Sequence, residues 1–265
     1  MMTFDFTGKK AIVAGAGSGI GKAIALQLAA NGADVWVGDI VGENAKAVVN
    51  EMSEKYGKNY GYTEINVTDK KDIEKLFQEA KEAFGEINIV VNSAGVFIAR
   101  SMTEASPEEI KNHLDINLMG LVYGCQIALL TMIEQGKGGK IVNISSVGGR
   151  QGELGSPYYS LGKAAIINLS QSVAFSGAPH GINCNTICPG IIRTPMWDTI
   201  LEAESGGDPS VDKEELFDKI VKARTPLGRA QTAEEMAYAV AFFCSGYADA
   251  ITGQALNVDG GDRMN

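Results

Sequence analysis

The sequence predicts one α/β domain, residues 1–265, in which helices cover both faces of a doubly wound parallel sheet. Apolar runs of strand length alternate with longer stretches of helical period. The strand runs are apolar on both faces, as in parallel sheets buried between helices. The 32 glycines, against only 7 prolines, suit many tight strand-to-helix turns. No internal repeat or second domain is indicated.

The expected elements follow these runs in chain order. Strands are predicted at 10–15, 34–39, 60–67, 87–95, 139–146, 182–190 and 254–261. Helices are predicted at 19–32, 45–57, 69–85, about 107–134, from about 157, and at 232–246.

Two helices illustrate the signals. Between 69 and 85, Ile73, Leu76, Phe77 and Ala80 recur at the spacing of one helix face. Gly32 is a stop signal for the first helix. Right-handed crossovers between successive strands then give the doubly wound arrangement.

Residues 191–230 interrupt this alternation. The segment is rich in charge, contains EAESGGDPSVDKEE and is too long for an ordinary connection. A solvated linker is one interpretation. In a compact domain, a lid over a substrate pocket is the favoured one.

The charge balance restricts the possible partners. The formal net charge is −9 and the pI about 4.9, whereas nucleic acids and anionic membranes require Lys and Arg. The N-terminus lacks the apolar run of a signal peptide, and no run of roughly 20 apolar residues indicates a membrane span. We therefore expect a soluble cytoplasmic protein with a small-molecule substrate and no nucleic-acid or membrane partner.

The four cysteines are Cys125, Cys184, Cys188 and Cys244. The pair Cys184 and Cys188 is a weak metal signal, because no second ligand pair stands nearby. We expect buried free thiols and no metal site.

A glycine-rich stretch, AGAGSGIGKA, separates the first strand from the first helix. It places Gly15, Gly17, Gly19 and Gly21 in the pattern G-x-x-x-G-x-G. Without Cβ atoms the backbone can approach a pyrophosphate, and the helix N-terminus offers free N–H groups and a positive dipole end. A glycine loop alone is weak evidence, but its place in the first strand–helix unit meets the context for dinucleotide binding.

Asp39 ends the second predicted strand. Its carboxylate can accept hydrogen bonds from adenosine ribose hydroxyls and would repel a 2′-phosphate. Positions 16–20 and 40–42 hold no Arg or Lys to compensate. The sequence therefore favours NAD(H) over NADP(H), with a solvated Asp in a turn as the alternative.

The stretch YYSLGK contains a tyrosine and a lysine at helical spacing. Tyr159 and Lys163 are four residues apart and share one helix face, whereas Tyr158 points elsewhere. An ammonium favours the phenolate, so we expect Lys163 to lower the pKa of Tyr159 toward the range of a general acid/base. The spacing alone is common, and a structural pair is the alternative.

Polar residues elsewhere favour the catalytic interpretation. Ser145 and Ser146 end one strand, and Asn92 begins the NSAG stretch at the end of another, where α/β sheets bind ligands. Asn117 lies inside a predicted helix, although asparagine is a poor helix former.

Together these motifs resemble the short-chain dehydrogenase/reductase family over nearly the whole chain. The glycine loop at 15–21, NSAG at 92–95, Asn117, Ser146, Tyr159 with Lys163, and PGIIRTP at 189–195 follow the family's order and spacing. Ser146, thirteen residues before Tyr159, matches the family's catalytic serine, and Ser145 does not. The resemblance implies a Rossmann fold with a seven-stranded sheet and a homotetramer.

The resemblance also implies catalytic roles. Tyr159 would exchange the proton, and Lys163 would bind the nicotinamide ribose and lower the pKa of Tyr159. Ser146 would hold the substrate oxygen. Asn117 would support a water in a proton relay.

The same resemblance implies the NAD site. Thr194 and the backbone near Ile192 would hold the carboxamide, and Asn92, Ala94 and Gly95 would line the adenosine and ribose side. The expected cofactor-binding residues are Gly15, Ser18, Gly19, Ile20, Gly21, Asp39, Ile40, Asn66, Val67, Asn92, Ala94, Gly95, Tyr159, Lys163, Pro189, Gly190, Ile192 and Thr194.

Two residues depart from the family pattern. Ala14 stands where Thr is common and loses one hydrogen bond that orders the loop. Asn66 stands where Asp is common, but its carbonyl oxygen can still meet the adenine amino group.

The expected reaction is NAD(H)-dependent hydride transfer between a secondary alcohol and a ketone. Apolar Met196 and Trp197 would shield the hydride-transfer site from water. CPGIIRTPMW and VDGGDRMN resemble acetoin/butanediol and sorbitol-type dehydrogenases, so a small polyol, diol or acyloin is the favoured substrate. A hydroxysteroid, for example a bile acid, is the alternative, because the small Gly148 and Gly149 could admit a flat ring system.

Other classes of function fit less well. A non-catalytic dinucleotide sensor would keep the glycine loop but typically lacks the Tyr/Lys pair. A serine hydrolase would need a G-x-S-x-G elbow, which is missing. His113 and His180, the only histidines, are expected on helix surfaces or in satisfied structural roles.

Overall fold

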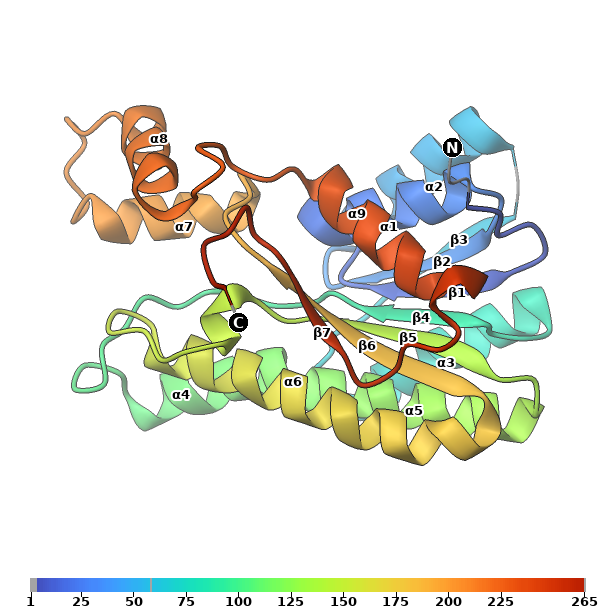
Figure 1. Cartoon of the computed structure of the whole chain (residues 1–265). Coiled ribbons are helices and arrows are strands. Elements are labelled where there is room, and N and C mark those ends of the chain that lie inside the picture. Colours follow the sequence, from blue (N-terminus) through green and yellow to red (C-terminus); the bar gives the residue numbers. More distant parts are fainter. Residues whose placement is uncertain (1–3, 58, 265) are drawn as a thin grey trace.

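The computed structural model describes residues 4–57 and 59–264, in which a seven-stranded sheet lies between two layers of helices (Figure 1). Neighbouring strands are all parallel, in the order β3-β2-β1-β4-β5-β6-β7. The strands are β1 (Lys10–Ala14), β2 (Asp34–Asp39), β3 (Tyr60–Glu64), β4 (Ile89–Asn92), β5 (Gly139–Ile144), β6 (Ile182–Pro189) and β7 (Ala255–Val258). The predicted doubly wound fold and the seven-stranded sheet are confirmed.

Most of the helices lie where the periodicity predicts them. The α-helices are α1 (Gly19–Ala30), α2 (Gly42–Tyr56), α3 (Lys70–Phe84), α4 (Pro107–Leu114), α5 (Gly120–Gln135), α6 (Pro157–Gly177), α7 (Pro195–Glu204), α8 (Lys213–Arg224) and α9 (Ala233–Cys244). Local chemistry fixes their ends. Asp69 caps α3 by accepting from the Lys71 N–H, and Gly85 ends it in the left-handed conformation. Thr232 and Glu235 form a reciprocal capping box at α9.

Each face of the sheet has its own apolar core. On one face α1, α2 and α9 pack with residues such as Ile24, Val37 and Val240. On the other face α3, α5 and α6 pack with residues such as Leu76 and Met132. These side chains are almost fully buried, and each contributes about 1.5–3 kcal/mol by leaving water. The cores hold the strand ends rigidly, and the strand ends carry the candidate site.

The strand order reverses at β1. β2 pairs on one side of β1 and β4 on the other, with Ala14 opposite both Gly38 and Asn92. The loops that leave β1 and β4 therefore turn to opposite faces of the sheet and open a crevice at the carboxyl edge. In open α/β sheets this is where ligands bind.

The long helix predicted at 107–134 contains a change of pitch. α4 continues into a π-helical turn, Asp115–Met119, and then into α5. Over 107–135 this is the one helical stretch in the described part of the chain that is long and apolar enough to cross a membrane, which corrects the expectation that none exists. In the fold it packs against the sheet and α6, as core helices do.

Residues 191–230 fold into two helices rather than a loop. α7 and α8 extend beyond the carboxyl edge of the sheet (Figure 1) and share a small core of Ile191, Trp197, Leu201, Phe217 and Val221. The Trp197 and Phe217 rings meet edge to face at 5.1 Å. The segment is therefore held largely by its own contacts.

Because this core is separate from the two sheet cores, Phe217→Ala should loosen α7 and α8 without unfolding the sheet. Truncating a buried Phe costs about 3–5 kcal/mol, and here the loss is local. Hydrogen exchange should accelerate across 195–224 while the amides of β1, β4 and β5 stay protected. The matched control, Phe77→Ala in the sheet core, should lower global stability; global unfolding of Phe217→Ala would contradict a separate core.

Candidate active site

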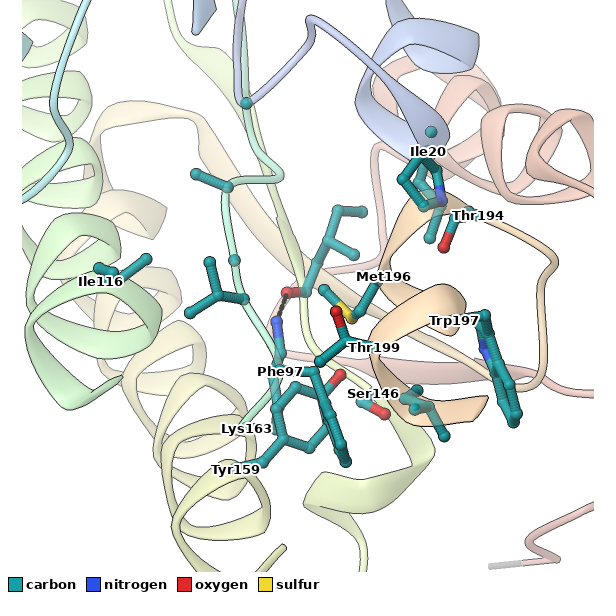
Figure 2. A pocket seen from close by; sticks show the side chains of 18 of the residues that line it. Ile20, Phe97, Ile116, Ser146, Tyr159, Lys163, Thr194, Met196, Trp197 and Thr199 are labelled. Carbon is teal, nitrogen blue, oxygen red and sulfur yellow. Dashed lines mark hydrogen bonds between the residues drawn. The ribbon is translucent and has the colours of Figure 1, made fainter. Parts of the chain in front are cut away.

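A cavity of about 1180 Å³ opens at the carboxyl edge of the sheet. The glycine loop after β1, the ends of β2, β4, β5 and β6, the start of α6, and α7 all line it. Figure 2 shows Ser146, Tyr159 and Lys163 on one side of this space and Met196 and Thr199 of α7 facing them. The crevice at the reversal of strand order is thus a real cavity with polar groups along its wall.

The cavity gathers nearly all of the predicted site residues. Those that line it are Gly15, Ser18, Gly19, Ile20, Gly21, Asp39, Ile40, Asn66, Val67, Ala94, Gly95, Ser146, Tyr159, Lys163, Pro189, Gly190, Ile192 and Thr194. Asn92 and Asn117 are not among them. Segments that are far apart in the sequence meet here: a Cβ placed on Gly19 would lie 3.5 Å from the Thr194 methyl carbon.

The glycine loop is shaped for close backbone packing. A Cβ on Gly21 would stand 2.0 Å from the Gly15 carbonyl oxygen, and a Cβ on Gly15 would stand 2.4 Å from the Ala94 nitrogen. Gly15 also has φ +78°, which disfavours other residues. The Ser18 side chain does not cap α1, and no acidic side chain occupies its first turn. The first N–H groups of α1 are therefore free for an anion such as a pyrophosphate, so the loop fits a dinucleotide.

Asp39 is fixed by the backbone at the far end of the cavity. One carboxylate oxygen accepts from the Gly17 N–H at 2.7 Å and the other from the Val41 N–H at 3.0 Å. Each oxygen keeps lone pairs for further hydrogen bonds. Among the described residues that line the cavity, Lys163 and Arg224 are the cationic ones. Neither belongs to the glycine loop or to the 40–42 stretch that follows Asp39.

Two asparagines behave differently from the expectation. Asn92 is buried and donates to the Asn143 side chain at 2.8 Å, so it joins β4 to β5 and does not line the cavity. Asn66 lines the cavity, but its Oδ1 already accepts from the Thr68 N–H at 3.0 Å and hydroxyl at 2.8 Å. The adenine contact expected of this oxygen would have to displace one of these bonds.

The tyrosine and lysine of YYSLGK lie on one face of α6, as their spacing predicts. Lys163 is 4% exposed, and its Nζ lies 5.6 Å from the centre of the Tyr159 ring (Figure 2). Lys163 Nζ also donates to the Ile144 carbonyl oxygen at 3.1 Å. Both serines line the cavity, but the Ser145 hydroxyl donates to the Lys163 carbonyl oxygen, whereas the Ser146 oxygen accepts from the Gly148 N–H at 3.0 Å.

Burial, rather than Lys163, dominates the pKa of Tyr159. Burial raises the pKa of this phenol to about 12, a hydrogen bond with Ser146 opposes the rise, and the Glu153 charge adds to it. Burial also lowers the pKa of Lys163 to about 8, because the ammonium loses hydration. The expectation that Lys163 brings the phenol toward neutral pH is therefore wrong for the protein without cofactor.

Asn117 holds a loop of the cavity in place from the π-helical turn. Its Oδ1 accepts from the Val96 N–H and its Nδ2 donates to the Val96 carbonyl oxygen, both at 3.0 Å. This pair of bonds fixes the loop that follows β4. Single π-helical turns often occur at functional sites. The bonds that Asn117 makes from this turn explain why an asparagine, a poor helix former, stands inside the helix.

The sequence predicts His113 either on a helix surface or in a structural role with its hydrogen bonds satisfied. The surface position is wrong. His113 is 1% exposed, contacts the Asn117 amide, and its ring centre lies 6.1 Å from that of Tyr159. Burial, and then the Lys163 charge, lower the pKa of His113, which favours the neutral ring. Its spacing of four residues before Asn117 was the available signal.

Two further residues of the cavity, Phe97 and Glu153, were not predicted from the sequence. The Phe97 ring packs edge to face on Tyr159 at 5.2 Å and restricts its position. Glu153 lines the cavity from the loop before α6. Neither belongs to a motif, and only the fold brings them to Tyr159. Within the described residues, no group of three or more His, Cys, Asp or Glu side chains could hold a metal. All four cysteines are buried free thiols, as the sequence predicts.

Comparisons with known proteins agree with this geometry. Residues 15–262 match the family model described as Enoyl-(Acyl carrier protein) reductase. The chain is 37% identical to 3-oxoacyl-[acyl-carrier-protein] reductase FabG of Aquifex aeolicus, over 98% of this chain and 99% of that protein. It is 35% identical to a diacetyl reductase [(S)-acetoin forming] of Staphylococcus epidermidis, over 96% and 98%. It is 34% identical to a sorbitol dehydrogenase of Cereibacter sphaeroides, over 97% and 98%.

The fold has a close structural counterpart. The crystal structure of a short-chain type dehydrogenase/reductase from Mycobacterium marinum superposes with a TM-score of 0.89 at 28% identity. The match covers 99% of this chain and 98% of that one.

In the protein without cofactor, Tyr159 should keep its proton beyond pH 10, because burial raises its pKa to about 12. The measurement is tyrosinate absorbance of the wild type minus that of Tyr159→Phe, titrated from neutral to alkaline pH. Adding NAD⁺ should move the difference titration to lower pH, since a positive charge favours the phenolate. If the Tyr159 phenol lost its proton near neutral pH without NAD⁺, Lys163 alone would be sufficient to lower its pKa, which would contradict this account.

Proposed function

The chain belongs to the short-chain dehydrogenase/reductase family, and we propose that it interconverts a secondary alcohol and a ketone with NAD(H). One observation carries the proposal: Ser146, Tyr159 and Lys163 meet in the cavity that the glycine loop also lines. A hydroxyl, a phenol and an ammonium there can hold and protonate a substrate oxygen beside a bound dinucleotide.

The chain's residues divide the work at the substrate oxygen. Ser146 and the Tyr159 phenol would both hydrogen-bond this oxygen, and Tyr159 would give or take its proton. Lys163, held by the Ile144 carbonyl, adds positive charge that stabilises a developing alkoxide. Met196 and Thr199 on α7 close the opposite side, which limits water. A nicotinamide dinucleotide bound along the glycine loop and Asp39 would supply the hydride acceptor or donor for this chemistry.

NAD(H) is the cofactor that the pocket supports best. The Asp39 carboxylate is held by two backbone N–H groups at the end of β2, where ribose hydroxyls can donate to it. Among the described residues of the pocket, no cation lies at this end to pair with a 2′-phosphate. A 2′-phosphate would therefore meet a negative charge without compensation.

The proposed substrate is a small polyol, diol or acyloin. Relatives named diacetyl reductase and sorbitol dehydrogenase support this class, whereas relatives named 3-oxoacyl-[acyl-carrier-protein] reductase point to a carrier-bound ketone. The cavity of about 1180 Å³ must hold the dinucleotide as well, and the room that remains suits a small molecule. A hydroxysteroid is the alternative, favoured by the apolar side chains of Met196 and Ile200 in the wall.

We further propose a cytoplasmic homotetramer that binds neither nucleic acid nor membrane. The net charge of −9 supports the absence of polyanion binding. Large apolar side chains lie exposed on α5 and α6, Leu130 and Phe175 among them, and contacts between subunits would cover such groups.

Tyr159→Phe should lower kcat by about 100- to 10,000-fold, because it removes the group that exchanges the proton. The assay follows NADH absorbance with diols, acyloins, sugar alcohols and hydroxysteroids. NAD⁺ should still bind the variant. Tyr158→Phe is the matched control, since its hydroxyl contacts the Met102 carbonyl outside the cavity. No NAD-dependent turnover of any alcohol by the wild type would favour a non-catalytic dinucleotide sensor.

Asp39→Ala should shift the ratio of kcat/KM for NAD⁺ over NADP⁺ by about tenfold or more toward NADP⁺. The variant loses charge-assisted hydrogen bonds to the ribose and a repulsion of the 2′-phosphate. Glu43→Ala, an exposed acid of α2 outside the cavity, is the control and should leave the ratio unchanged. An unchanged ratio in Asp39→Ala would remove this carboxylate from cofactor selection.

A further inference from the structure

The carboxylate of Glu153 borders the same space as Ser146 and Tyr159. It lines the cavity, and its side chain is 25% exposed. Tyr159, whose pKa the Glu153 charge raises, lines the same cavity. Ser156, at the start of α6 and one helical turn before Tyr159, donates to Glu153 Oε2 at 3.3 Å. Glu153 is therefore held in the wall of the cavity that also contains the reacting groups.

The arginines around Glu153 belong mainly to a different carboxylate. Asp262, whose side chain is 1% exposed, lies 2.9 Å from Arg224 Nη2 and 2.8 Å from Arg263 Nη1. Glu153 Oε1 lies 3.6 Å from a nitrogen of each guanidinium, beyond hydrogen-bonding distance. The arginines orient Glu153, but its oxygens keep acceptor capacity toward the cavity.

From this arrangement we infer that Glu153 selects the substrate by accepting a hydrogen bond from a second hydroxyl, adjacent to the carbon that reacts. The inference rests on the proposed oxidation of secondary alcohols and narrows its substrate class to vicinal diols, polyols and acyloins. Ser146 and Tyr159 hold the reacting oxygen, and Glu153 holds the neighbouring one. An ionic acceptor in the cavity wall that loses its hydroxyl partner is penalised, which gives discrimination against an alcohol without one.

The same carboxylate disfavours anionic substrates. Glu104 and Glu204 also line this cavity, while Arg224, the one arginine among the described lining residues, is engaged by Asp262. A substrate carboxylate, or the phosphate of a carrier-linked acyl chain, would meet these three carboxylates, against which Lys163 offers a single ammonium among the described residues of the cavity. The pocket thus favours neutral hydroxylated molecules over carrier-bound 3-oxoacyl groups.

The test compares kcat/KM with NAD⁺ for butane-2,3-diol, butan-2-ol and 3-hydroxybutanoate, which share four carbons. The wild type should prefer the diol over butan-2-ol by about 10- to 100-fold. Glu153→Gln should lose most of this preference, because kcat/KM for the diol falls much more than kcat/KM for butan-2-ol. It should also raise the relative rate with 3-hydroxybutanoate, because the repelling charge is gone.

Glu214→Gln is the matched control. Glu214 also pairs with an arginine, Arg193, at 2.7 Å, but lies outside the cavity. The variant should keep the diol preference. If Glu153 only held α8 in place through Arg224, Glu153→Gln would slow both alcohols equally.

The outcomes separate the two proposals. Turnover of alcohols without a diol preference, or a preference that survives in Glu153→Gln, overturns the role of Glu153 and leaves the oxidoreductase proposal standing. No NAD-dependent turnover of any alcohol overturns both. Efficient turnover of 3-hydroxybutanoate by the wild type, above that of the diol, overturns the charge selection.

Discussion

The reversal of strand order at β1 is the constraint on which the rest of the structure depends. β2 and β4 pair with β1 on opposite sides, so the connections that follow β1 and β4 turn to opposite faces of the sheet. A crevice therefore opens at the carboxyl edge of the sheet. Several groups of the pocket follow strands that reach this edge: Gly15 after β1, Asp39 at the end of β2, Ser146 after β5 and Gly190 after β6. The two apolar cores then keep these strand ends in fixed positions.

Burial at this edge acts on the two titrating groups in opposite directions. It raises the pKa of Tyr159 and lowers that of Lys163, because both lose hydration of the charged form. Without cofactor the phenol is therefore protonated at neutral pH and ready to act as an acid. To act as a base it needs additional positive charge nearby, which an oxidised nicotinamide carries.

The sequence was sufficient for the fold, and most of the site residues that it predicted line the cavity, with Asn92 and Asn117 as exceptions. Period and glycine placement predicted the alternating strands and helices, and the spacing of Tyr159 and Lys163 placed both on one helix face. The sequence could not predict properties that depend on burial, such as the pKa of a side chain. The pKa of Tyr159 was expected to fall because the spacing shows a nearby charge, whereas the structure shows that desolvation outweighs it. Likewise His113 and Glu153 belong to no motif, and only tertiary packing brings them to the phenol.

For residues 191–230 too, the sequence predicted an unusual segment but not the helices that it forms. Its charge and length indicated an unusual connection, but the mixed pattern did not reveal α7 and α8, whose apolar residues face mostly each other. The part of the pocket wall that these helices form depends on the small apolar core that α7 and α8 share. Sequence period detects an element that packs on the main sheet more readily than a pair that packs on itself.

The most direct test of the central claim follows the hydrogen that leaves the substrate carbon. The protein is incubated with NAD⁺ and a secondary alcohol deuterated at that carbon, and the reduced dinucleotide is analysed by mass spectrometry. Direct transfer in a water-excluding pocket predicts one deuterium in each NADH formed. Unlabelled NADH, or none at all, would contradict hydride transfer at this site.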